Sequence, residues 1–195
     1  TRLYPLTLTQ PKLLLDVAGR SMIDRVLENL TTISFIDEIY IVSNARFSSH
    51  FEAWAKQKRG AIPQKLTVIN DGSSGEENRL GAIGDLSFVI RQQLIDDDVI
   101  VVAGDNLFSQ SLELFGDYCR KVATPVLGVY DVGRFESAKK YSEVHTDMDG
   151  QITSFEEKPE TPTTTMIGVA LYYFPRTILS KITSYVEGGN NPDQP

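Results

Sequence analysis

An acidic residue at the end of an apolar run is the first candidate for chemistry. Asp105 follows residues 99–103, the most hydrophobic run of the chain, in the turn Gly104-Asp105-Asn106. In an open α/β sheet, ligands bind outside the carboxyl ends of the strands. A carboxylate there suits Mg²⁺, which takes one or two carboxylates together with phosphate oxygens and water. The alternative is an ordinary turn aspartate, and position alone leaves both interpretations open.

Two cations in the N-terminal segment form a second candidate group. Arg2 and Lys12 lie on either side of a proline-containing stretch that leads toward the first helical pattern. Arginine and lysine side chains are the usual protein partners of phosphate. The alternative is that both are solvated surface cations in a loop.

The third candidate group is Phe155-Glu156-Glu157-Lys158-Pro159. Strand alternation would place Phe155 and Glu157 on one face and Glu156 and Lys158 on the other. A carboxylate can accept hydrogen bonds from sugar hydroxyls, and a lysine can bind a phosphate. The alternative is a charged strand end before a proline.

Small residues at the start of a helical pattern form the fourth group, around Gly81 and Gly84. They would let a planar base or a phosphate approach the backbone, and the N–H groups of a helix N-terminus favour anions. No Gly-Lys-Ser or Gly-Lys-Thr follows, so this is not a P-loop. A Gly-x-x-Gly pattern on its own is weak evidence.

Four apolar runs rich in β-branched residues predict the strands that position these groups. The runs lack polar alternation, which is typical of strands covered on both faces. Amphipathic patterns lie between them, and the first begins after Ser21, a residue type that caps helices. This alternation indicates βαβ units in an open α/β sheet. The predicted strands cover residues 39–42, 66–69, 99–103 and 126–130, and the helical patterns fall within residues 22–30, 47–54, 80–94 and 112–122.

The pattern changes in the last third of the chain. Residues 143–146 and 151–155 predict a β-hairpin with an Asp-Gly turn at Asp149 and Gly150. Residues 169–174 predict a further strand, and Pro175 marks the start of another helix. No linker or repeat separates these segments, so a single domain is expected.

Composition excludes several classes of protein. The 195 residues carry a net charge of −7, which argues against general binding to nucleic acid or to an anionic membrane. A phosphate-bearing ligand would therefore need a few placed cations and a metal ion. The single cysteine, Cys119, excludes an internal disulfide and a cysteine-based zinc cluster, and His50 and His145 lack metal-ligand spacing. No apolar run approaches the length of a membrane span and no signal peptide is evident, so a cytoplasmic location is expected.

The order and spacing of these blocks resemble the sugar-phosphate nucleotidyltransferases, most of all their glucose-1-phosphate thymidylyl- and uridylyltransferase branch. The matching blocks are T-R-L-Y-P-L-T with Q-P-K-L-L-L-D-V-A-G-R-S-M-I, D-E-I-Y-I-V-S-N, N-R-L-G-A-I-G-D, V-I-V-V-A-G-D-N, F-E-E-K-P and Y-Y-F-P. The resemblance extends over residues 1–195 as one catalytic domain. It implies a Rossmann-like three-layer α/β fold with a mostly parallel central sheet and an added β-hairpin region that binds the sugar.

The same resemblance implies a reaction. A nucleoside triphosphate, with dTTP or UTP expected first, and a sugar 1-phosphate, with glucose 1-phosphate expected first, would give an NDP-sugar and pyrophosphate. The resemblance implies that Arg2 holds the triphosphate and stabilises the leaving pyrophosphate, and that Lys12 neutralises charge near the α-phosphate. Asp105 would ligate Mg²⁺ at the nucleotide, and Gly81 would lie against the base. The family commonly forms homo-oligomers.

On the sugar side, the resemblance implies that Lys158 binds the sugar phosphate and Glu157 the sugar hydroxyls, with Tyr141 beside them. The chain departs from the family pattern here, because Ser142 and Ala170 stand where glycines are usual. These departures leave the sugar open. They also motivate an alternative, a non-catalytic NDP-sugar-binding or regulatory module.

Two further expectations follow from the family pattern. A strand with a Gly-rich loop would precede Thr1, and a second metal-binding aspartate would follow Pro195. A glycosyltransferase on a similar sheet is a third hypothesis. It would need an Asp-x-Asp metal motif, and the match at Asp147 and Asp149 falls in the predicted hairpin turn.

Overall fold

The first long helix, α1 (Met22–Leu30), begins at the predicted cap residue in this computed structural model, which describes residue 3 and residues 5–193. The Ser21 hydroxyl accepts a hydrogen bond from the backbone N–H of Asp24 at 3.3 Å, which satisfies one of the free donors of the first turn. The predicted apolar face is the buried one, and it consists of Ile23, Val26, Leu27 and Leu30.

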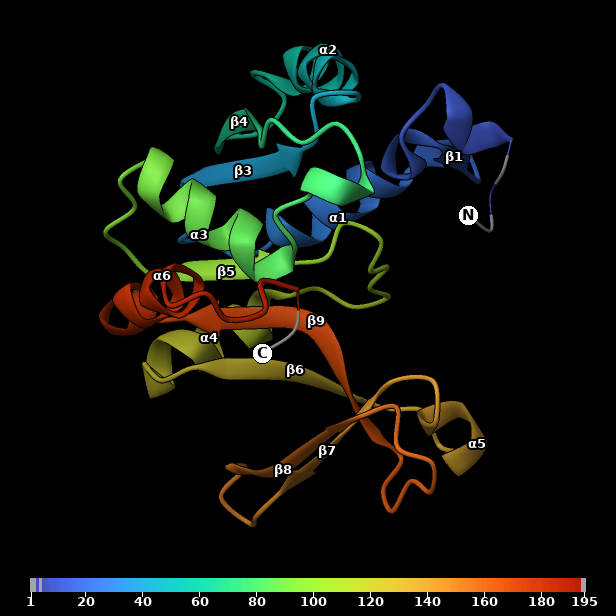
Figure 1. The fold of residues 1–195 in the computed structure, drawn as a ribbon, viewed down its shortest axis with the longest axis vertical. Coiled ribbons are helices and arrows are strands. Elements are labelled where there is room, and N and C mark those ends of the chain that lie inside the picture. The colour runs from blue at the N-terminus through green and yellow to red at the C-terminus, as the bar shows by residue number, and fades with distance from the viewer. Residues whose placement is uncertain (1–2, 4, 194–195) are drawn as a thin grey trace.

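A parallel pair of strands covers one side of α1. Strand β3 (Glu38–Ser43) pairs in parallel with β4 (Lys65–Asn70), and helix α2 (Ser48–Lys58) connects them. This βαβ unit forms the upper part of the molecule in Figure 1. Its core packs residues of α1, α2 and the two strands together: Ile23, Leu27, Ile39, Phe51, Trp54, Ala55 and Leu66.

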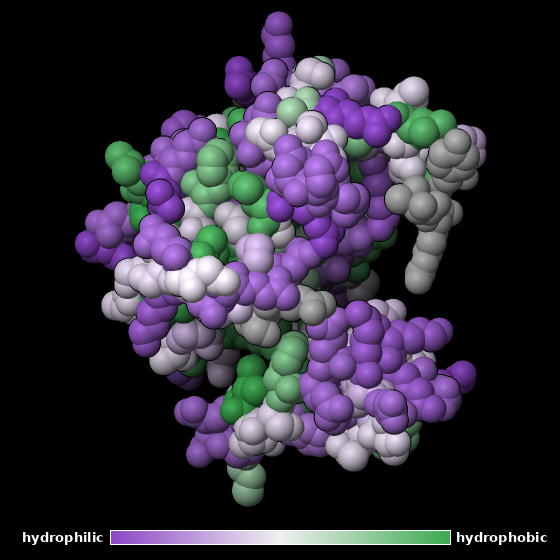
Figure 2. Space-filling model, viewed as in Figure 1, coloured by the Kyte–Doolittle hydropathy of each residue, from purple (hydrophilic) through white to green (hydrophobic). Residues whose placement is uncertain are grey.

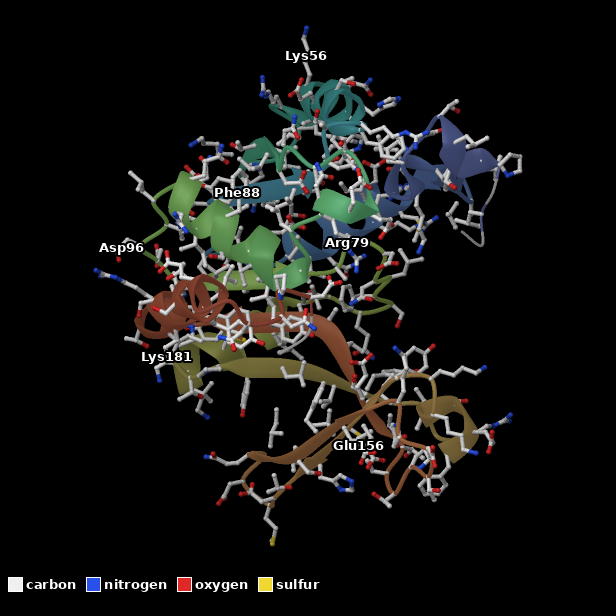
Figure 3. All side chains as sticks on the ribbon, in the orientation of Figure 1. Lys56, Arg79, Phe88, Asp96, Glu156 and Lys181 are labelled. Carbon is white, nitrogen blue, oxygen red and sulfur yellow. The ribbon has the colours of Figure 1, made fainter. Side chains whose placement is uncertain are left out.

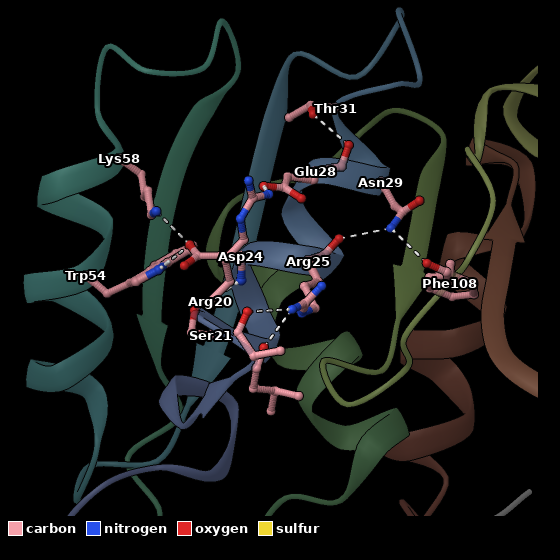
Figure 4. A network of polar contacts seen from close by, with 12 residues as sticks. Arg20, Ser21, Asp24, Arg25, Glu28, Asn29, Thr31, Trp54, Lys58 and Phe108 are labelled. Atoms are coloured by element: carbon pink, nitrogen blue, oxygen red, sulfur yellow. Dashed lines mark hydrogen bonds and ion pairs between the residues drawn. The ribbon is translucent and has the colours of Figure 1, made fainter.

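Polar contacts tie α2 to α1 (Figure 4). The indole N–H of Trp54 donates to Oδ1 of Asp24 at 2.9 Å, and Nζ of Lys58 lies 2.7 Å from the same oxygen. Asp24 is half-buried, and hydrogen bonds and the charge of Lys58 lower its pKa against the opposing effect of burial. The carboxylate therefore joins two helices that the apolar core already packs together.

Helix α1 also donates side-chain hydrogen bonds to backbone carbonyls of two other segments (Figure 4). Arg25 donates to the backbone carbonyl of Val17 at 2.6 Å, in the short ribbon formed by β1 (Asp16–Val17) and β2 (Arg20–Ser21). The Asn29 amide donates to the backbone carbonyl of Phe108 at 3.4 Å. One helix thus binds the chain shortly after Lys12 and shortly after Asp105.

The second sheet has β9 (Met166–Phe174) at its centre. β9 runs antiparallel to β5 (Val99–Val102), β6 (Val126–Asp131) and β7 (Ser142–Thr146), and β7 also pairs with β8 (Ile152–Glu157) as the predicted hairpin. β5 and β6 therefore point the same way. The mixed α/β fold is confirmed. The expectation of a mostly parallel central sheet is wrong: among the named strands only β3 and β4 pair in parallel, and every strand pair in the second sheet is antiparallel. The reason is β9, which returns from the hairpin and enters between β5 and β6, two strands that share a direction.

Helices lie on both faces of this sheet. In Figure 1, α3 (Ala82–Gln92) and α6 (Leu179–Glu187) lie in front of the strands, and α4 (Glu113–Val122) lies behind. A second core cluster joins α1, the start of α4 and the sheet through Val26, Leu30, Ile33, Leu112 and Leu171. The remaining elements are short: η1 (Leu6–Leu8), η2 (Lys12–Leu14), η3 (Glu76–Asn78), α5 (Phe135–Ala138) and η4 (Arg176–Ile178).

Within the described residues, no strand pairing links the β3–β4 sheet to the sheet built on β9. There, β3 pairs with β4 alone and β5 pairs with β9 alone, so no backbone ladder joins the two sheets. Side-chain packing on α1 connects them instead. Among the helices of this described part, none is both long enough and apolar enough to cross a membrane.

Candidate active site

The structure brings Lys12 and Asp105 into direct contact across 93 residues of sequence. Nζ of Lys12, in η2, lies 2.6 Å from Oδ2 of Asp105, in the turn after β5. The side chains are 46% and 48% exposed, so both remain accessible to a ligand. The two residues assigned separately to the phosphates and the metal therefore form one ion pair at the carboxyl end of a sheet strand.

Close packing between two short segments sets this contact. A Cβ at Gly104 would lie 2.5 Å from Cδ1 of Leu13, so any other residue there would displace the Leu13 side chain in η2. The Asp105 turn is also fixed to β9, because the side-chain amide of Asn106 donates to the backbone carbonyl of Ala170 at 3.2 Å. Gly104 was the available sequence signal, and sequence reasoning read it only as part of a turn.

The donor set at Asp105 suits a metal ion that arrives with a phosphate. No group of three or more His, Cys, Asp or Glu side chains in the described part of the chain could hold an ion by itself. Mg²⁺ characteristically binds through one or two carboxylates, with substrate phosphates and water completing its shell. A single half-exposed carboxylate beside a lysine is consistent with that mode of binding.

The hairpin brings Tyr141, Glu157 and Lys158 together as a second group. Ser142, next to Tyr141, pairs with Glu157 in the β7–β8 ladder. The backbone N–H of Lys158 donates to the carbonyl of Tyr141 at 2.9 Å, and its Nζ lies 2.7 Å from Oε1 of Glu157. The three side chains are all exposed.

The predicted alternation of faces is wrong at Lys158. β8 ends at Glu157, and Lys158 has a positive φ of 48°. The chain leaves the strand there, so the lysine side chain returns toward Glu157 instead of pointing to the opposite face. A non-glycine residue in this region carries backbone strain of roughly 1–2 kcal/mol.

Gly81 belongs to a third group, at the start of α3. The space beside its Cα, where a Cβ would stand, is filled by Pro192 and Asp193 near the end of the described chain. Its φ is +79°, and a Cβ would lie 2.8 Å from the carbonyl oxygen of Pro192. That carbonyl accepts from the backbone N–H of Ile83 at 2.8 Å and from that of Gly84 at 3.3 Å. The first N–H groups of α3 are thus already occupied, and Arg79 forms an ion pair with Asp193 beside them (Figure 3 labels Arg79).

A pocket of about 440 Å³ lies next to this group, at the carboxyl ends of β3 and β4. Sequence reasoning did not identify it, although these strand ends fall where ligands bind in open sheets. Its walls combine charged and polar side chains with Phe47, and they include Ser43, Asn44, Arg46, Asp71, Arg79 and Asp85.

Asp85 is the most perturbed carboxyl group in this pocket. Its pKa is raised to about 6, first by burial and then by the charge of Asp71 and a hydrogen bond with it, with Asp193 adding to the effect. Its Oδ1 atom is buried and has no hydrogen-bond partner among the described residues. Two carboxylates thus share one wall of the pocket.

Sequence reasoning also missed Glu143, a buried carboxylate beneath the hairpin group. Glu143 is 5% exposed, and its Oε2 accepts from the backbone N–H of Thr163 at 2.9 Å. That hydrogen bond is the main cause of the lowered pKa of Glu143. The sequence signal that could have revealed Glu143 is its position: an acidic residue within a predicted strand, directly before the apolar Val144.

The remaining candidates have simpler positions. Arg2 lies outside the described residues. Asp147 accepts from the backbone N–H groups of Asp149 and Gln151 at 3.0 and 2.8 Å, so this carboxylate stabilises the hairpin turn. Cys119 is buried on α4, as predicted, and burial raises its pKa to about 11.

Comparison with known proteins places this geometry in a family context. The family model described as nucleotidyl transferase matches residues 1–194. A Sulfolobus acidocaldarius protein provisionally named mannose-1-phosphate guanyltransferase is 32% identical over 183 residues, which are 93% of this chain and 47% of that protein. Mannose-1-phosphate guanylyltransferase of Mycobacterium tuberculosis is 28% identical, over 93% of this chain and 48% of its own length. The chain thus spans about half the length of these relatives.

Solved structures share the fold at lower identity. A Bacillus anthracis protein provisionally assigned as a glucose-1-phosphate thymidylyltransferase superposes with a TM-score of 0.77 at 19% identity, over 95% of this chain and 70% of that one. A UDP-glucose pyrophosphorylase complexed with UDP-glucose superposes with a TM-score of 0.73 at 16% identity, over 92% and 73%. At these identities the similarity establishes the fold alone.

Proposed function

The chain belongs to the nucleotidyl transferase family, among the sugar-phosphate nucleotidyltransferases, and from this premise we propose that it joins an NTP to a sugar 1-phosphate. A phosphate oxygen of the sugar 1-phosphate attacks the α-phosphorus of the NTP. The bond between the α-phosphorus and the bridging oxygen breaks, and pyrophosphate leaves. This chemistry depends on positioning and on neutralising charge more than on covalent catalysis.

The contact between Lys12 and Asp105 carries the proposal. Mg²⁺, when bound, would reduce the repulsion between two anionic substrates, and Asp105 is the residue to hold it. Lys12, released from the carboxylate, would then reach the α-phosphate from its position in η2. We assign the pyrophosphate oxygens to Arg2, as the family resemblance implies.

We assign the sugar 1-phosphate to the hairpin group. Lys158 would bind its phosphate, Glu157 would accept its hydroxyl groups, and Tyr141 would lie beside them. The surface is hollowed between the lower part of the molecule, which carries the hairpin and α5, and the upper part, which carries η2 and β1–β2 (Figure 2). We propose this hollow as the place where the two substrates bind.

For the nucleotide, we propose GTP, with mannose 1-phosphate as the acceptor. The two relatives above carry guanyltransferase names. Asp71 and Asp85 line the pocket beside α3, and carboxylates accept hydrogen bonds only. Guanine offers two adjacent N–H donor groups on one edge, whereas uracil and thymine offer a single N–H between two carbonyls. Gly81 would meet the base only on the side away from Pro192, because the Pro192 carbonyl fills the space where a Cβ would stand.

The pair expected from the sequence, dTTP or UTP with glucose 1-phosphate, is the second candidate. The likeness of the sequence blocks to the thymidylyl- and uridylyltransferase branch favours it. Pyrophosphate release should be measured with Mg²⁺, with GTP, dTTP, UTP, CTP and ATP, and with mannose and glucose 1-phosphates. Turnover restricted to dTTP or UTP would reject the guanine assignment and leave the reaction class intact.

Asp105→Ala tests the metal assignment. We expect it to lose several orders of magnitude in turnover, while Asp117→Ala, which removes an exposed carboxylate from α4, should keep full activity. The alternative, a non-catalytic NDP-sugar-binding module, is motivated by Ser142 and Ala170 at usual glycine positions. It predicts calorimetric binding of an NDP-sugar with no pyrophosphate release from any substrate pair.

A further inference from the structure

A buried carboxylate joins the hairpin to the segment that follows Lys158. Oε2 of Glu143 accepts from the backbone N–H of Thr163 at 2.9 Å and from that of Thr164 at 3.5 Å. The Thr163 hydroxyl donates to Oε1 at 3.3 Å. Nε2 of His145 lies 3.4 Å from Oε1 and 2.9 Å from the Thr163 oxygen. Such charge-assisted bonds are the stronger class of hydrogen bond in proteins.

The segment between residues 158 and 164 is fixed at both ends. At its start, the Lys158 N–H donates to the Tyr141 carbonyl at 2.9 Å. At its end, the N–H groups of Thr163 and Thr164 donate to Glu143. Both anchors lie on one stretch of three residues, 141–143, so the segment closes back on the beginning of β7.

The segment is also stiff between its anchors. Pro159 and Pro162 are both buried, and proline fixes φ near −65°. Lys158 itself has a left-handed backbone, a conformation that persists only when the surroundings hold it. The position of the Lys158 ammonium group therefore depends on how firmly the segment is attached to β7.

We propose that Glu143 is a positioning residue for the sugar 1-phosphate: it holds the 158–164 segment against β7 and so fixes Lys158 beside Tyr141 and Glu157. The inference rests on the proposed function, which assigns the sugar phosphate to Lys158. Glu143 does not contact the substrate, because its carboxylate is buried and fully engaged by the segment. Its loss reaches the substrate only through Lys158.

Glu143→Gln tests this with little change in shape. The amide has one accepting oxygen in place of two, so it cannot satisfy the backbone N–H groups and the Thr163 hydroxyl together without rearrangement. Because hydrogen bonds to a charged group are among the stronger ones, we expect their loss to raise the KM of the sugar 1-phosphate about tenfold. The KM of the NTP should not change, since Lys12 and Asp105 lie on other elements.

Glu156→Gln is the matched control. Glu156 pairs with Glu143 in the β7–β8 ladder and is exposed, so the variant removes one negative charge from the same pair of strands without releasing the segment (Figure 3 labels Glu156). Both KM values should stay at the wild-type level. Glu143→Asp, which retains the charge on a shorter side chain, should recover part of the loss caused by Glu143→Gln.

Amide hydrogen exchange supplies a readout that does not depend on activity. In Glu143→Gln, exchange should accelerate at Lys158, Thr163 and Thr164 while α1 and β3 keep their protection. Faster exchange with an unchanged KM for the sugar 1-phosphate would overturn the proposal and leave a structural role. A wild-type protein with no turnover would reject the proposed function instead, and unchanged exchange in the variant would reject the anchor itself.

Discussion

Leu13 occupies the space above Gly104 where any other residue would place its Cβ. The distance from that Cβ position to Cδ1 of Leu13 is 2.5 Å, and Cδ2 and Cγ follow at 3.3 and 3.5 Å. Leu13 is partly buried and packs against the core of α1, α2, β3 and β4, so a shift of its side chain would disturb that packing. Leu13 follows Lys12 and Gly104 precedes Asp105, so this contact lies directly beside the ion pair of Lys12 and Asp105.

Gly104→Ala should therefore lower kcat strongly while lowering the free energy of unfolding only modestly. Overpacking of this kind costs about 1–3 kcal/mol, and the displacement falls on the segment that carries Lys12. We expect a lower kcat at saturating substrate, with a modest shift of the urea midpoint. Gly133→Ala is a suitable control for stability, because nothing lies within 4 Å of a Cβ there and its positive φ of 68° adds only local strain. Equal losses of activity in the two variants would contradict the packing argument.

Lys12→Gln should have opposite effects on metal binding and on turnover. The ammonium group competes with a metal ion for Oδ2 of Asp105, at 2.6 Å, so its removal should tighten the binding of Mn²⁺, measured by electron paramagnetic resonance without nucleotide. Loss of a charge that stabilises the transition state should lower kcat by about 10²–10³-fold. The control Lys139→Gln removes a lysine that pairs with Glu136 on α5 and should change neither quantity. Weaker Mn²⁺ binding in Lys12→Gln would contradict the competition.

Elements that depend on local sequence could be predicted. The strands at residues 39–42 and 99–103 were predicted because β-branched residues without polar alternation form strands covered on both faces. Helix α1 was predicted from its cap at Ser21 and its apolar spacing. In each case the pattern that predicts the element lies within about ten consecutive residues. The local structure of these elements therefore follows from side chains that are neighbours in sequence.

What the sequence could not supply are relationships between distant segments. The contact of Lys12 with Asp105 and the neighbouring contact of Leu13 with Gly104 join segments about ninety residues apart, so no local pattern reveals them. The insertion of β9 between β5 and β6 depends on how the chain returns from the hairpin. The backbone of Lys158 depends on Tyr141 and on the Thr163–Glu143 bond, so an alternation rule that extends β8 by one residue is wrong there.

Lys158→Gly should separate backbone strain from function. A left-handed conformation costs a non-glycine residue roughly 1–2 kcal/mol, while the greater backbone freedom of glycine in the unfolded chain offsets about 0.5–1 kcal/mol. We expect equal or slightly higher stability in urea, together with a KM for the sugar 1-phosphate at least about tenfold higher, as loss of a charged hydrogen bond implies. Lys158→Ala should show the same rise in KM without any gain in stability. A normal KM in both variants would remove Lys158 from the phosphate site.

The acidic pair Asp71 and Asp85 gives a pH dependence with a definite sign. Burial, followed by the charge of Asp71, raises the pKa of Asp85 from 3.8 to about 6. Between these two values the folded protein retains a proton that the unfolded chain has released, so stability falls as pH rises through this window. At neutral pH the ionised form of Asp85 therefore costs on the order of 3 kcal/mol, most of it from burial, since each pKa unit corresponds to about 1.36 kcal/mol.

Asp85→Asn should therefore stabilise the protein at pH 7.5 and have little effect below pH 4, because the amide carries no charge and can donate a hydrogen bond to Asp71. Urea unfolding at pH 4, 5.5 and 7.5 measures this difference. The same variant should raise the KM for GTP more than that for inosine triphosphate, which lacks the 2-amino donor of guanine. Stabilisation at pH 7.5 with an unchanged preference between the two nucleotides would leave the electrostatic account intact and would remove Asp85 from base recognition.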